Sequence, residues 1–347
     1  MSGHPGLAGM FGPTEALDIV RDEFELGLSS GPRSRPALVV EIAAGPDLEA
    51  LELLAPELPC VLIGVTDNDD AAPPKGFDIL LSSLGGPRPW VHREDLEAAV
   101  RTLVGSITAS PQASVALVQL LRLGAELSVR DALVAESFAY SMLQAGPVFG
   151  SWLAGRPEPA MTISETDPVV VRRDGAYLEI RLNRPEVRNA LNAAMRDALL
   201  SALEIVVIDH SIASAHISGE GPAFCAGGDL KEFGLAEDPV TAHAVRVSRS
   251  VGALLSRCSD RVAVHVHGAC VGAGIEIPAF SGHVAATPDA TFSLPEVGFG
   301  LIPGAGGTVS IPRRIGRQRT AYMAITGETI TAATALQWHL IDEIHGT

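Results

Sequence analysis

Three glycine-rich segments occupy the second half of this chain, and they constrain its fold more than any other feature. They cover residues 221–231, 267–276 and 294–308. Glycine lets backbone N–H groups approach a ligand closely and adopt conformations that a side chain would forbid. The first segment lacks the spacing of a phosphate-binding loop or a dinucleotide fingerprint. Taken alone, it is equally compatible with a tight turn around the buried thiol of Cys225.

Composition narrows the class of protein. The 347 residues carry 41 acidic and 25 basic side chains, for a formal charge of −16, and 47% of the residues are hydrophobic. A chain of this length is expected to bury a substantial core and to form about two domains. Its acidity argues against nucleic acid or an anionic membrane as a partner, because both require a basic face.

The expected location and the expected lack of a metal site depend on motifs that the sequence does not contain. No apolar run approaches the ~18 residues of a membrane span, and the first residues do not have the layout of a secretion signal. The cysteines are far apart and form no Cys-x-x-Cys pair, so we expect neither a metal site nor a disulfide framework. They are Cys60, Cys225, Cys258 and Cys270. We therefore expect a cytoplasmic protein.

Residues 1–89 are predicted to form an N-terminal α/β region. A helix is expected at residues 14–28, where turn-forming residues then interrupt the pattern. Asp47 is a candidate N-cap for a second helix at residues 48–54. Apolar stretches predict three strands, at residues 36–42, 60–66 and 76–82.

Residues 90–160 are predicted to be helical. Leu96, Val100 and Leu103 recur with the period of a helix, and similar stripes follow them. Ser128 is a candidate N-cap for the last long helix of this region. Helices this apolar are expected to pack against another domain or subunit.

Residues 168–347 alternate strands and helices, which indicates an α/β region. An amphipathic helix is predicted at residues 189–203, and a later helix is expected from Arg313 onwards. Strands are predicted at residues 169–171, 177–182, 214–218 and 262–266.

Two glutamates in the glycine-rich segments are candidates for acid–base chemistry. Glu276 follows small residues that are expected to begin a helix, and the first N–H groups of a helix are free to bind an acceptor. The alternative interpretation is that the Glu276 carboxylate only caps this helix. Glu296 is flanked by apolar residues, which raise the pKa of a carboxyl towards the range useful for proton transfer. An ordinary surface position in a loop is the alternative for Glu296.

Taken together, the segments resemble the catalytic core of the enoyl-CoA hydratase/isomerase (crotonase) superfamily. The matching strings occur in family order and spacing over roughly half of the chain, at residues 182–192, 223–231, 268–276, 295–296 and 302–308. The resemblance implies an α/β crotonase fold, a spiral of ββα units with a helical oligomerisation region.

The resemblance also implies specific chemistry. The backbone N–H groups of Gly228 and Ala273 would form an oxyanion hole for an acyl-CoA thioester, although Ala273 stands where the family usually has glycine. Glu276 and Glu296 fill both carboxylate positions of the hydratases. Coenzyme A would enter as part of the substrate, with no permanently bound cofactor and no metal.

Contacts to the acyl-CoA substrate are also assigned by resemblance. Lys231 and Arg188 are the candidate cations for the CoA part, and solvated surface charge is the alternative for each. The arginines at 313, 314, 317 and 319 are interpreted as a solvated helix face. The substrate-contacting set implied by position is Arg188, Ala190, Ala226, Asp229, Leu230, Lys231 and Gly304.

The order of the parts departs from the family. Residues 93–157 weakly resemble the helical tail that normally follows the core and covers its pocket. We therefore predict a rearranged chain: residues 1–89 form a degenerate partial core, residues 90–160 form the tail, and residues 168–347 form the catalytic core. Family resemblance further implies a homotrimer or homohexamer.

Three functions are compatible with these observations. The presence of both glutamates favours an enoyl-CoA hydratase, which adds water to a 2-enoyl-CoA thioester. An isomerase or C–C hydrolase of the same superfamily would use one glutamate as a base. A non-catalytic partner subunit of an active paralogue is the third possibility, but a scaffold has no physical need for the carboxylates.

Overall fold

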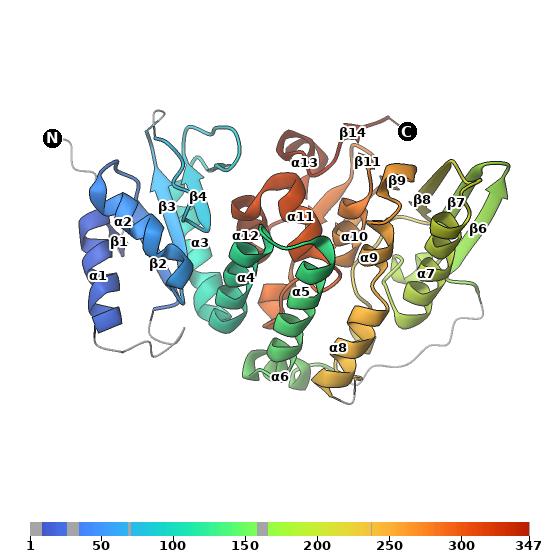
Figure 1. Ribbon diagram of the computed structural model, residues 1–347, viewed down its shortest axis with the longest axis horizontal. Coiled ribbons are helices and arrows are strands. Elements are labelled where there is room, and N and C mark those ends of the chain that lie inside the picture. Colours follow the sequence, from blue (N-terminus) through green and yellow to red (C-terminus); the bar gives the residue numbers. More distant parts are fainter. Residues whose placement is uncertain (1–8, 26–34, 69–70, 158–165, 237, 347) are drawn as a thin grey trace.

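The computed structural model describes residues 9–25, 35–68, 71–157, 166–236 and 238–346. Its N-terminal unit is a five-stranded parallel sheet whose strands lie in chain order (Figure 1). The strands are β1 (Met10–Phe11), β2 (Ala37–Glu41), β3 (Val61–Thr66), β4 (Ile79–Ser82) and β5 (Val91–His92). This sheet confirms the three predicted strands, the last of which is shorter than expected.

The N-terminal sheet is buried on both faces, as is typical of parallel sheets. Leu38 and Val40 of β2 point to a small hydrophobic core shared with α1 (Pro13–Glu25) and α2 (Pro46–Leu54). Val39, between them, points to the opposite face and joins a large core that continues into the rest of the molecule. This alternation is that of a strand between two layers.

The start of the second N-terminal helix differs from the prediction. Asp47 is not the N-cap of α2, because the helix begins at Pro46 and Gly45 is the N-cap residue. Proline has the backbone angle of a first helical residue already fixed, so it sets the start of the helix. Asp47 instead accepts a hydrogen bond from the Thr14 hydroxyl at 2.6 Å. The last part of the helix predicted at residues 14–28 lies outside the described residues.

Four helices form the middle of the molecule. Ser128 caps the third by accepting a hydrogen bond from the Asp131 N–H, as predicted. No single helix in the described ranges is long and apolar enough to cross a membrane. The first two helices together have that length and composition, but the chain bends by 106° between them. The helices are α3 (Leu96–Ala109), α4 (Pro111–Gly124), α5 (Val129–Gln144) and α6 (Pro147–Ala154).

The C-terminal part contains a six-stranded sheet in the order β14-β11-β9-β8-β7-β6 and a three-stranded sheet in the order β10-β12-β13. The strands of the larger sheet are β6 (Val169–Asp174), β7 (Tyr177–Leu182), β8 (Ser214–Gly219), β9 (Val262–Val266), β11 (His283–Ala286) and β14 (Glu343–Ile344). The smaller sheet consists of β10 (Ala269–Val271), β12 (Thr291–Ser293) and β13 (Ile330–Thr331).

A strand–strand–helix unit recurs through this part, which confirms the expected α/β succession of ββα units. It appears as β6–β7–α7, β9–β10–α10 and β11–β12–α11. The helices are α7 (Ala193–Ile208), α8 (Pro239–Ser248), α9 (Val251–Leu255), α10 (Ala273–Glu276), α11 (Gly307–Ile315), α12 (Arg317–Thr326) and α13 (Ala332–Trp338).

Two helix starts differ from the predictions. Helix α7 begins at Ala193 rather than at Asn189, because Asn189 adopts a left-handed φ of 53° and Asn192 is the cap. A left-handed residue cannot continue a right-handed helix. Helix α11 begins at Gly307, six residues before the expected Arg313, because the glycine-rich loop itself turns into the helix.

The arginines of α11 and α12 do not form a solvated face, which corrects the prediction. Arg317 pairs with the buried Asp78 of the N-terminal sheet region at 3.1 Å, and Arg319 is 4% exposed and donates to the Trp90 carbonyl. Arg314 donates to the carbonyls of Ala279 and Ser281. Helix α12 packs against α3, α4 and β4, which lie far from it in the sequence, so no local pattern indicates that its arginines are covered.

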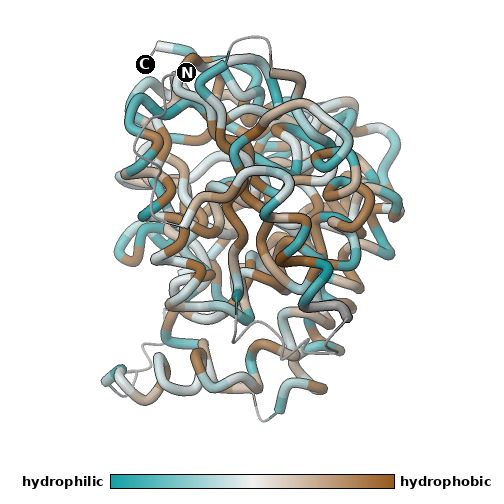
Figure 2. The backbone as a smooth tube through the Cα atoms, turned by 90° about the vertical axis from the view of Figure 1, so that its left-hand side faces the viewer, coloured by the Kyte–Doolittle hydropathy of each residue, from teal (hydrophilic) through white to brown (hydrophobic). Residues whose placement is uncertain are grey.

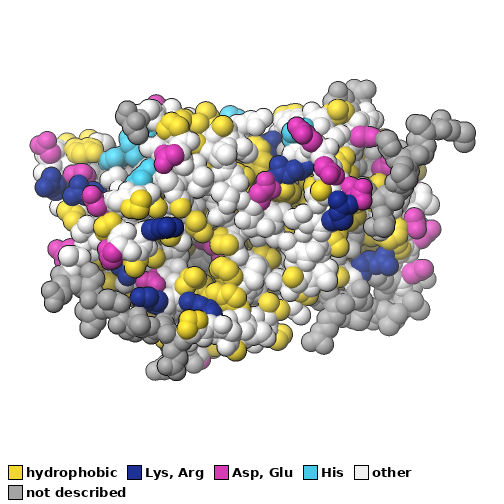
Figure 3. All heavy atoms as spheres, turned by 180° about the vertical axis from the view of Figure 1, so that it is seen from behind, with side chains coloured by type: hydrophobic (Ala, Val, Ile, Leu, Met, Phe, Trp, Pro, Cys, Tyr) yellow, Lys and Arg dark blue, Asp and Glu magenta, His cyan; other side chains and the backbone are white. Residues whose placement is uncertain are grey.

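One hydrophobic core therefore runs from the N-terminal sheet through the four helices into the C-terminal sheets. Figure 2 shows hydrophobic segments in the interior and hydrophilic ones at the periphery. On the back of the molecule, histidine side chains gather at one end (Figure 3). Ring contacts join His265 to His216 and to His345, across the outer face of the larger sheet.

Candidate active site

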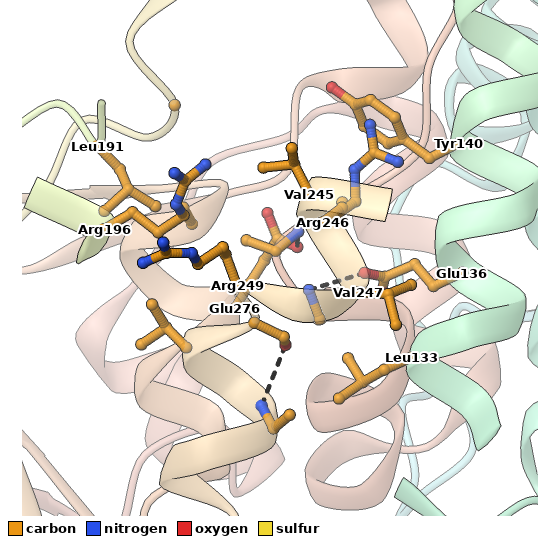
Figure 4. A pocket seen from close by; sticks show the side chains of 18 of the residues that line it. Leu133, Glu136, Tyr140, Leu191, Arg196, Val245, Arg246, Val247, Arg249 and Glu276 are labelled. Carbon is orange, nitrogen blue, oxygen red and sulfur yellow. Dashed lines mark hydrogen bonds between the residues drawn. The ribbon is translucent and has the colours of Figure 1, made fainter. Parts of the chain in front are cut away.

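A cavity of about 990 Å³ lies where α5 faces α7, α8 and α9 (Figure 4). Of the predicted site residues, six contribute to its lining. They are Gly228, Asp229, Ala273, Glu276, Glu296 and Gly304. The structure thus brings together residues from all three glycine-rich segments in one place.

The pairing of β10 with β12 explains why the two predicted glutamates meet. The strands are parallel, with Val271 opposite Ser293, so their carboxyl ends lie at the same edge. Glu276 follows the first strand by way of α10, and Glu296 follows the second in a short 3-10 turn. Both side chains are therefore carried to one wall of the cavity.

Among the described residues, the backbone N–H groups of Gly228 and Ala273 on that wall have no hydrogen-bond acceptor. Asp229 donates to the Leu191 carbonyl and Leu191 to the Gly227 carbonyl, which leaves the intervening Gly228 N–H unused by this bridge. Ala273 is the first residue of α10, where a helix leaves its N–H groups without intrahelical partners. Neither amide donates a hydrogen bond within the described part of the chain.

Alanine at position 273 is compatible with this arrangement. The left-handed φ, of 50°, falls on the preceding Gly272, while Ala273 has ordinary helical geometry. A Cβ on Gly272 would overlap the Glu296 carboxylate. Glycine is thus required at 272, where both glutamates approach the backbone, and not at 273.

Glu276 is 2% exposed and is held by backbone donors. Its Oε2 accepts hydrogen bonds from the N–H groups of Ala305 at 2.7 Å and Gly307 at 2.8 Å. Burial raises the pKa of Glu276 well above its ordinary value, and the charges of Glu296 and Glu136 raise it further. These contacts make Glu276 a fixed and buried carboxyl rather than a capping group for α10.

Glu296 has an unused oxygen. Its side chain is 9% exposed, and Oε2 is buried without a hydrogen-bond partner among the described residues. Burial raises the pKa of Glu296 to about 7, and the Glu136 carboxylate adds to the shift. A buried carboxyl with a free oxygen and a pKa near neutrality can exchange a proton with a bound molecule.

A third carboxylate, that of Glu136 on α5, was not among the predicted site residues. It lines the same cavity, and burial raises its pKa to about 7. Tyr140, one helical turn later, stacks under the guanidinium of Arg246 at 4.2 Å from the ring centroid. Glu136 lies on the same buried face of α5 as Ala132 and Leu143. A charged residue on an apolar helix face was the one sign in the sequence that could have indicated its role.

Helix α6 packs against two aromatic residues that neighbour the site. Trp152 stacks on Phe299, which lies three residues after Glu296, with ring centroids 4.8 Å apart. It also contacts Phe233 edge-on at 6.0 Å. The segment that carries Glu296 is therefore packed against a helix that precedes the C-terminal part of the chain.

The residues predicted to contact CoA are only partly brought together. Five of them lie outside the cavity lining: Arg188, Ala190, Ala226, Leu230 and Lys231. They surround the loop that carries Gly228, since the Ala226 N–H donates to the Arg188 carbonyl at 2.9 Å. Arginines that sequence reasoning missed line the cavity instead, and Figure 4 shows Arg196 and Arg249 on the side opposite Glu136.

Asn189 holds this loop in place. Its side chain is fully buried, accepts from the Arg184 N–H at 2.8 Å and donates to the carbonyls of Glu220 and Ala223 at 2.8 and 3.0 Å.

Asn189→Ala should lower the free energy of unfolding by about 2–3 kcal/mol, because buried backbone groups lose their partners. Urea denaturation measures this loss. Asn183→Ala, whose amide bonds only the Asp167 carbonyl, is the control, and an equal loss in both would contradict the prediction.

Comparison with known proteins identifies the family. A model described as enoyl-CoA hydratase/isomerase matches residues 172–347. The 2,3-dehydroadipyl-CoA hydratase of Escherichia coli is 36% identical over 176 residues, which cover 51% of this chain and 68% of that protein. The chain therefore belongs to the enoyl-CoA hydratase/isomerase (crotonase) family, as its motifs predicted.

Other relatives carry different activities in their names. The trans-2-decenoyl-[acyl-carrier-protein] isomerase of Streptococcus mutans is 31% identical over 175 residues, covering 49% of this chain and 66% of that protein. A crystal structure of an enoyl-CoA hydratase from Thermoplasma volcanium is 31% identical, covers 52% of this chain and 73% of its own, and has a TM-score of 0.48. Hydratases and isomerases thus both occur among the relatives.

Proposed function

We propose that this protein adds water to the double bond of a 2-enoyl-CoA thioester, in a syn addition. The observation that carries the proposal is the pair of buried carboxyls, Glu276 and Glu296, beside the free N–H groups of Gly228 and Ala273 in one cavity. Hydration needs a base for water, an acid for the α-carbon and donors for the carbonyl oxygen. The four groups can supply all three functions.

The proposed mechanism begins at the thioester carbonyl. As water attacks the β-carbon, negative charge develops on the carbonyl oxygen, and each of the Gly228 and Ala273 N–H groups would stabilise this charge by about 3–4 kcal/mol. One carboxyl takes a proton from water and the other gives a proton to the α-carbon. Neighbouring buried carboxyls cannot all ionise easily, which favours one ionised and one protonated partner.

The CoA part is proposed to lie along the loop at residues 188–190 and 226–231, with Arg188 and Lys231 as its cations. This placement is supported by the position of these segments beside Gly228, whose N–H group would bind the thioester carbonyl. The acyl part would then enter the cavity towards Gly304, which lies against the Tyr140 ring.

A hydration assay on a panel of 2-enoyl-CoA thioesters, from crotonyl to long-chain and cyclic acyl groups, tests this function. Loss of the enoyl absorbance with formation of a 3-hydroxyacyl-CoA is the expected result. Migration of the double bond without hydration would replace the proposal with an isomerase. If CoA esters do not bind at all, the non-catalytic subunit becomes the better interpretation.

A further inference from the structure

Four consecutive N–H groups, at residues 305–308 where the glycine-rich loop turns into α11, are shared between two carboxylates. Ala305 and Gly307 donate to Glu276, as described above. Between and beyond them, Gly306 donates to Glu136 Oε1 at 2.8 Å and Thr308 donates to Glu136 Oε2 at 3.0 Å. The loop at residues 305–308 is therefore held from two sides, and alternate amides point to alternate carboxylates.

Both oxygens of the Glu136 carboxylate accept hydrogen bonds from this segment. The Thr308 hydroxyl also donates to Oε2, at 2.7 Å, so that Glu136 accepts three hydrogen bonds from the loop. The side chain is 2% exposed and comes from α5, 170 residues earlier than Gly306. In Figure 4, Glu136 projects from α5 into the cavity, and a dashed line marks its hydrogen bond with a backbone N–H group.

We propose that Glu136 is a positioning residue for Glu276: by fixing the Gly306 and Thr308 amides, it aims the neighbouring Ala305 and Gly307 amides at the Glu276 carboxylate. This inference rests on the proposed function only for its effect on turnover. If the Gly306 and Thr308 amides lose their acceptor, the loop can rotate and Glu276 loses its two donors together. Small displacements of a reacting group lower rates strongly, by up to about 10²-fold for 1 Å.

Glu136 also contributes charge. The titratable and charged groups that face it are Glu276 on α10, Glu296 in the 3-10 turn, Tyr140 on its own helix and Arg246 on α8. A carboxylate raises the pKa of its carboxyl neighbours, because it disfavours their ionised forms. Removing its charge should therefore lower the pKa of Glu296, and the limb of the pH profile that belongs to Glu296 should move to lower pH.

The variant Glu136→Gln tests this role in the full chain, with Glu126→Gln, an exposed residue between α4 and α5, as the matched control. An amide keeps the size of the side chain but cannot accept hydrogen bonds on both ends. We expect kcat to fall by about 10- to 100-fold at nearly constant KM, with a pH profile displaced to lower pH. Wild-type kcat and an unmoved profile would overturn the proposal, as would a loss that vanishes once rates are normalised to folded protein.

A second measurement does not depend on activity. Hydrogen exchange resolved to single amides should accelerate in Glu136→Gln at all four positions, including Ala305 and Gly307, whose amides donate to Glu276 and not to Glu136. Faster exchange confined to Gly306 and Thr308 would show that Glu136 does not position Glu276. If the wild type hydrates no substrate, the proposed function fails, and this exchange pattern still decides the positioning role.

Thr308 provides a variant without a change of charge. Thr308→Val removes the hydroxyl donor to Glu136, and Thr308→Ser keeps it. We expect the valine variant to lose about 3- to 10-fold in kcat, at nearly constant KM, and the serine variant to match the wild type. Equal behaviour of the two variants would contradict the importance of this contact.

Discussion

Glu296→Gln is expected to lower kcat for hydration by about 10²–10⁴-fold, the contribution of a positioned acid or base. The substitution keeps the size of the side chain and its place in the turn after β12. It removes the carboxyl that we propose exchanges a proton through Oε2, which has no hydrogen-bond partner in the described part of the chain. Steady-state kinetics on the best substrate of the panel measures the loss. Glu204→Gln, on the exposed face of α7, should leave kcat unchanged.

The pH dependence identifies the role of Glu296. Its pKa is raised to about 7. If Glu296 gives its proton to the substrate, kcat falls as the pH rises through about 7; if it takes a proton from water, kcat falls as the pH drops through the same value. Glu296→Gln should abolish whichever limb belongs to it.

Glu276→Gln should cause a loss of similar size, and the double variant should be no worse than the poorer single variant, since the two carboxyls act as a unit. Additive losses would show that they act independently. A Glu296→Gln protein that retains more than a tenth of wild-type kcat would exclude Glu296 as the acid or base.

The second large effect concerns stability. Asp78 is 1% exposed and pairs with Arg122 at 2.6 Å and with Arg317 at 3.1 Å. It also accepts the Leu62 N–H at 2.9 Å. Asp78→Asn leaves two largely buried guanidinium groups without a carboxylate, so the free energy of unfolding should fall by about 3–5 kcal/mol. Chemical denaturation followed by circular dichroism measures the change.

An exposed ion pair supplies the comparison for Asp78. Glu97 and Arg101 pair on α3 with side chains 62% and 61% exposed, and Glu97→Gln should cost less than about 1 kcal/mol. A similar cost in both variants would mean that the buried network adds nothing beyond a surface pair. Separate unfolding of the N-terminal sheet in Asp78→Asn would locate the network as the link between that sheet and α12.

Local patterns in the sequence were sufficient for most of the elements. The strand at β3 and the Ser128 cap follow from residue order alone, because each depends on neighbours only a few positions away. The start of α7 was misplaced because the left-handed backbone at Asn189 is stabilised by distant carbonyls. The arginines of α12 were misjudged for the same reason, since their partners lie about 240 residues earlier.

The site residues also differ in whether a local pattern marks them or only distant contacts determine them. Glu276 and Glu296 were found because glycine-rich turns mark them in the sequence, and the pairing of β10 and β12 brings them together. Glu136 carries no such mark, since its partners are contributed by a loop 170 residues away. The expected rearrangement, with a helical tail at residues 90–160 ahead of the core, stays a prediction. Such a tail would have to line the cavity, as α5 does, and to pack beside the segment that carries Glu296, as α6 does.

The long separation between Glu136 and its donors also bears on how the protein is made. A ribosome adds about 5–20 residues per second from the N-terminus, so the 170 residues between Glu136 and Gly306 take roughly 10–30 s. Throughout that interval the Glu136 carboxylate lacks the donors that it has in the folded protein. The nascent α5 therefore cannot settle into its final surroundings early, and the cavity is completed only after Thr308 has been synthesised.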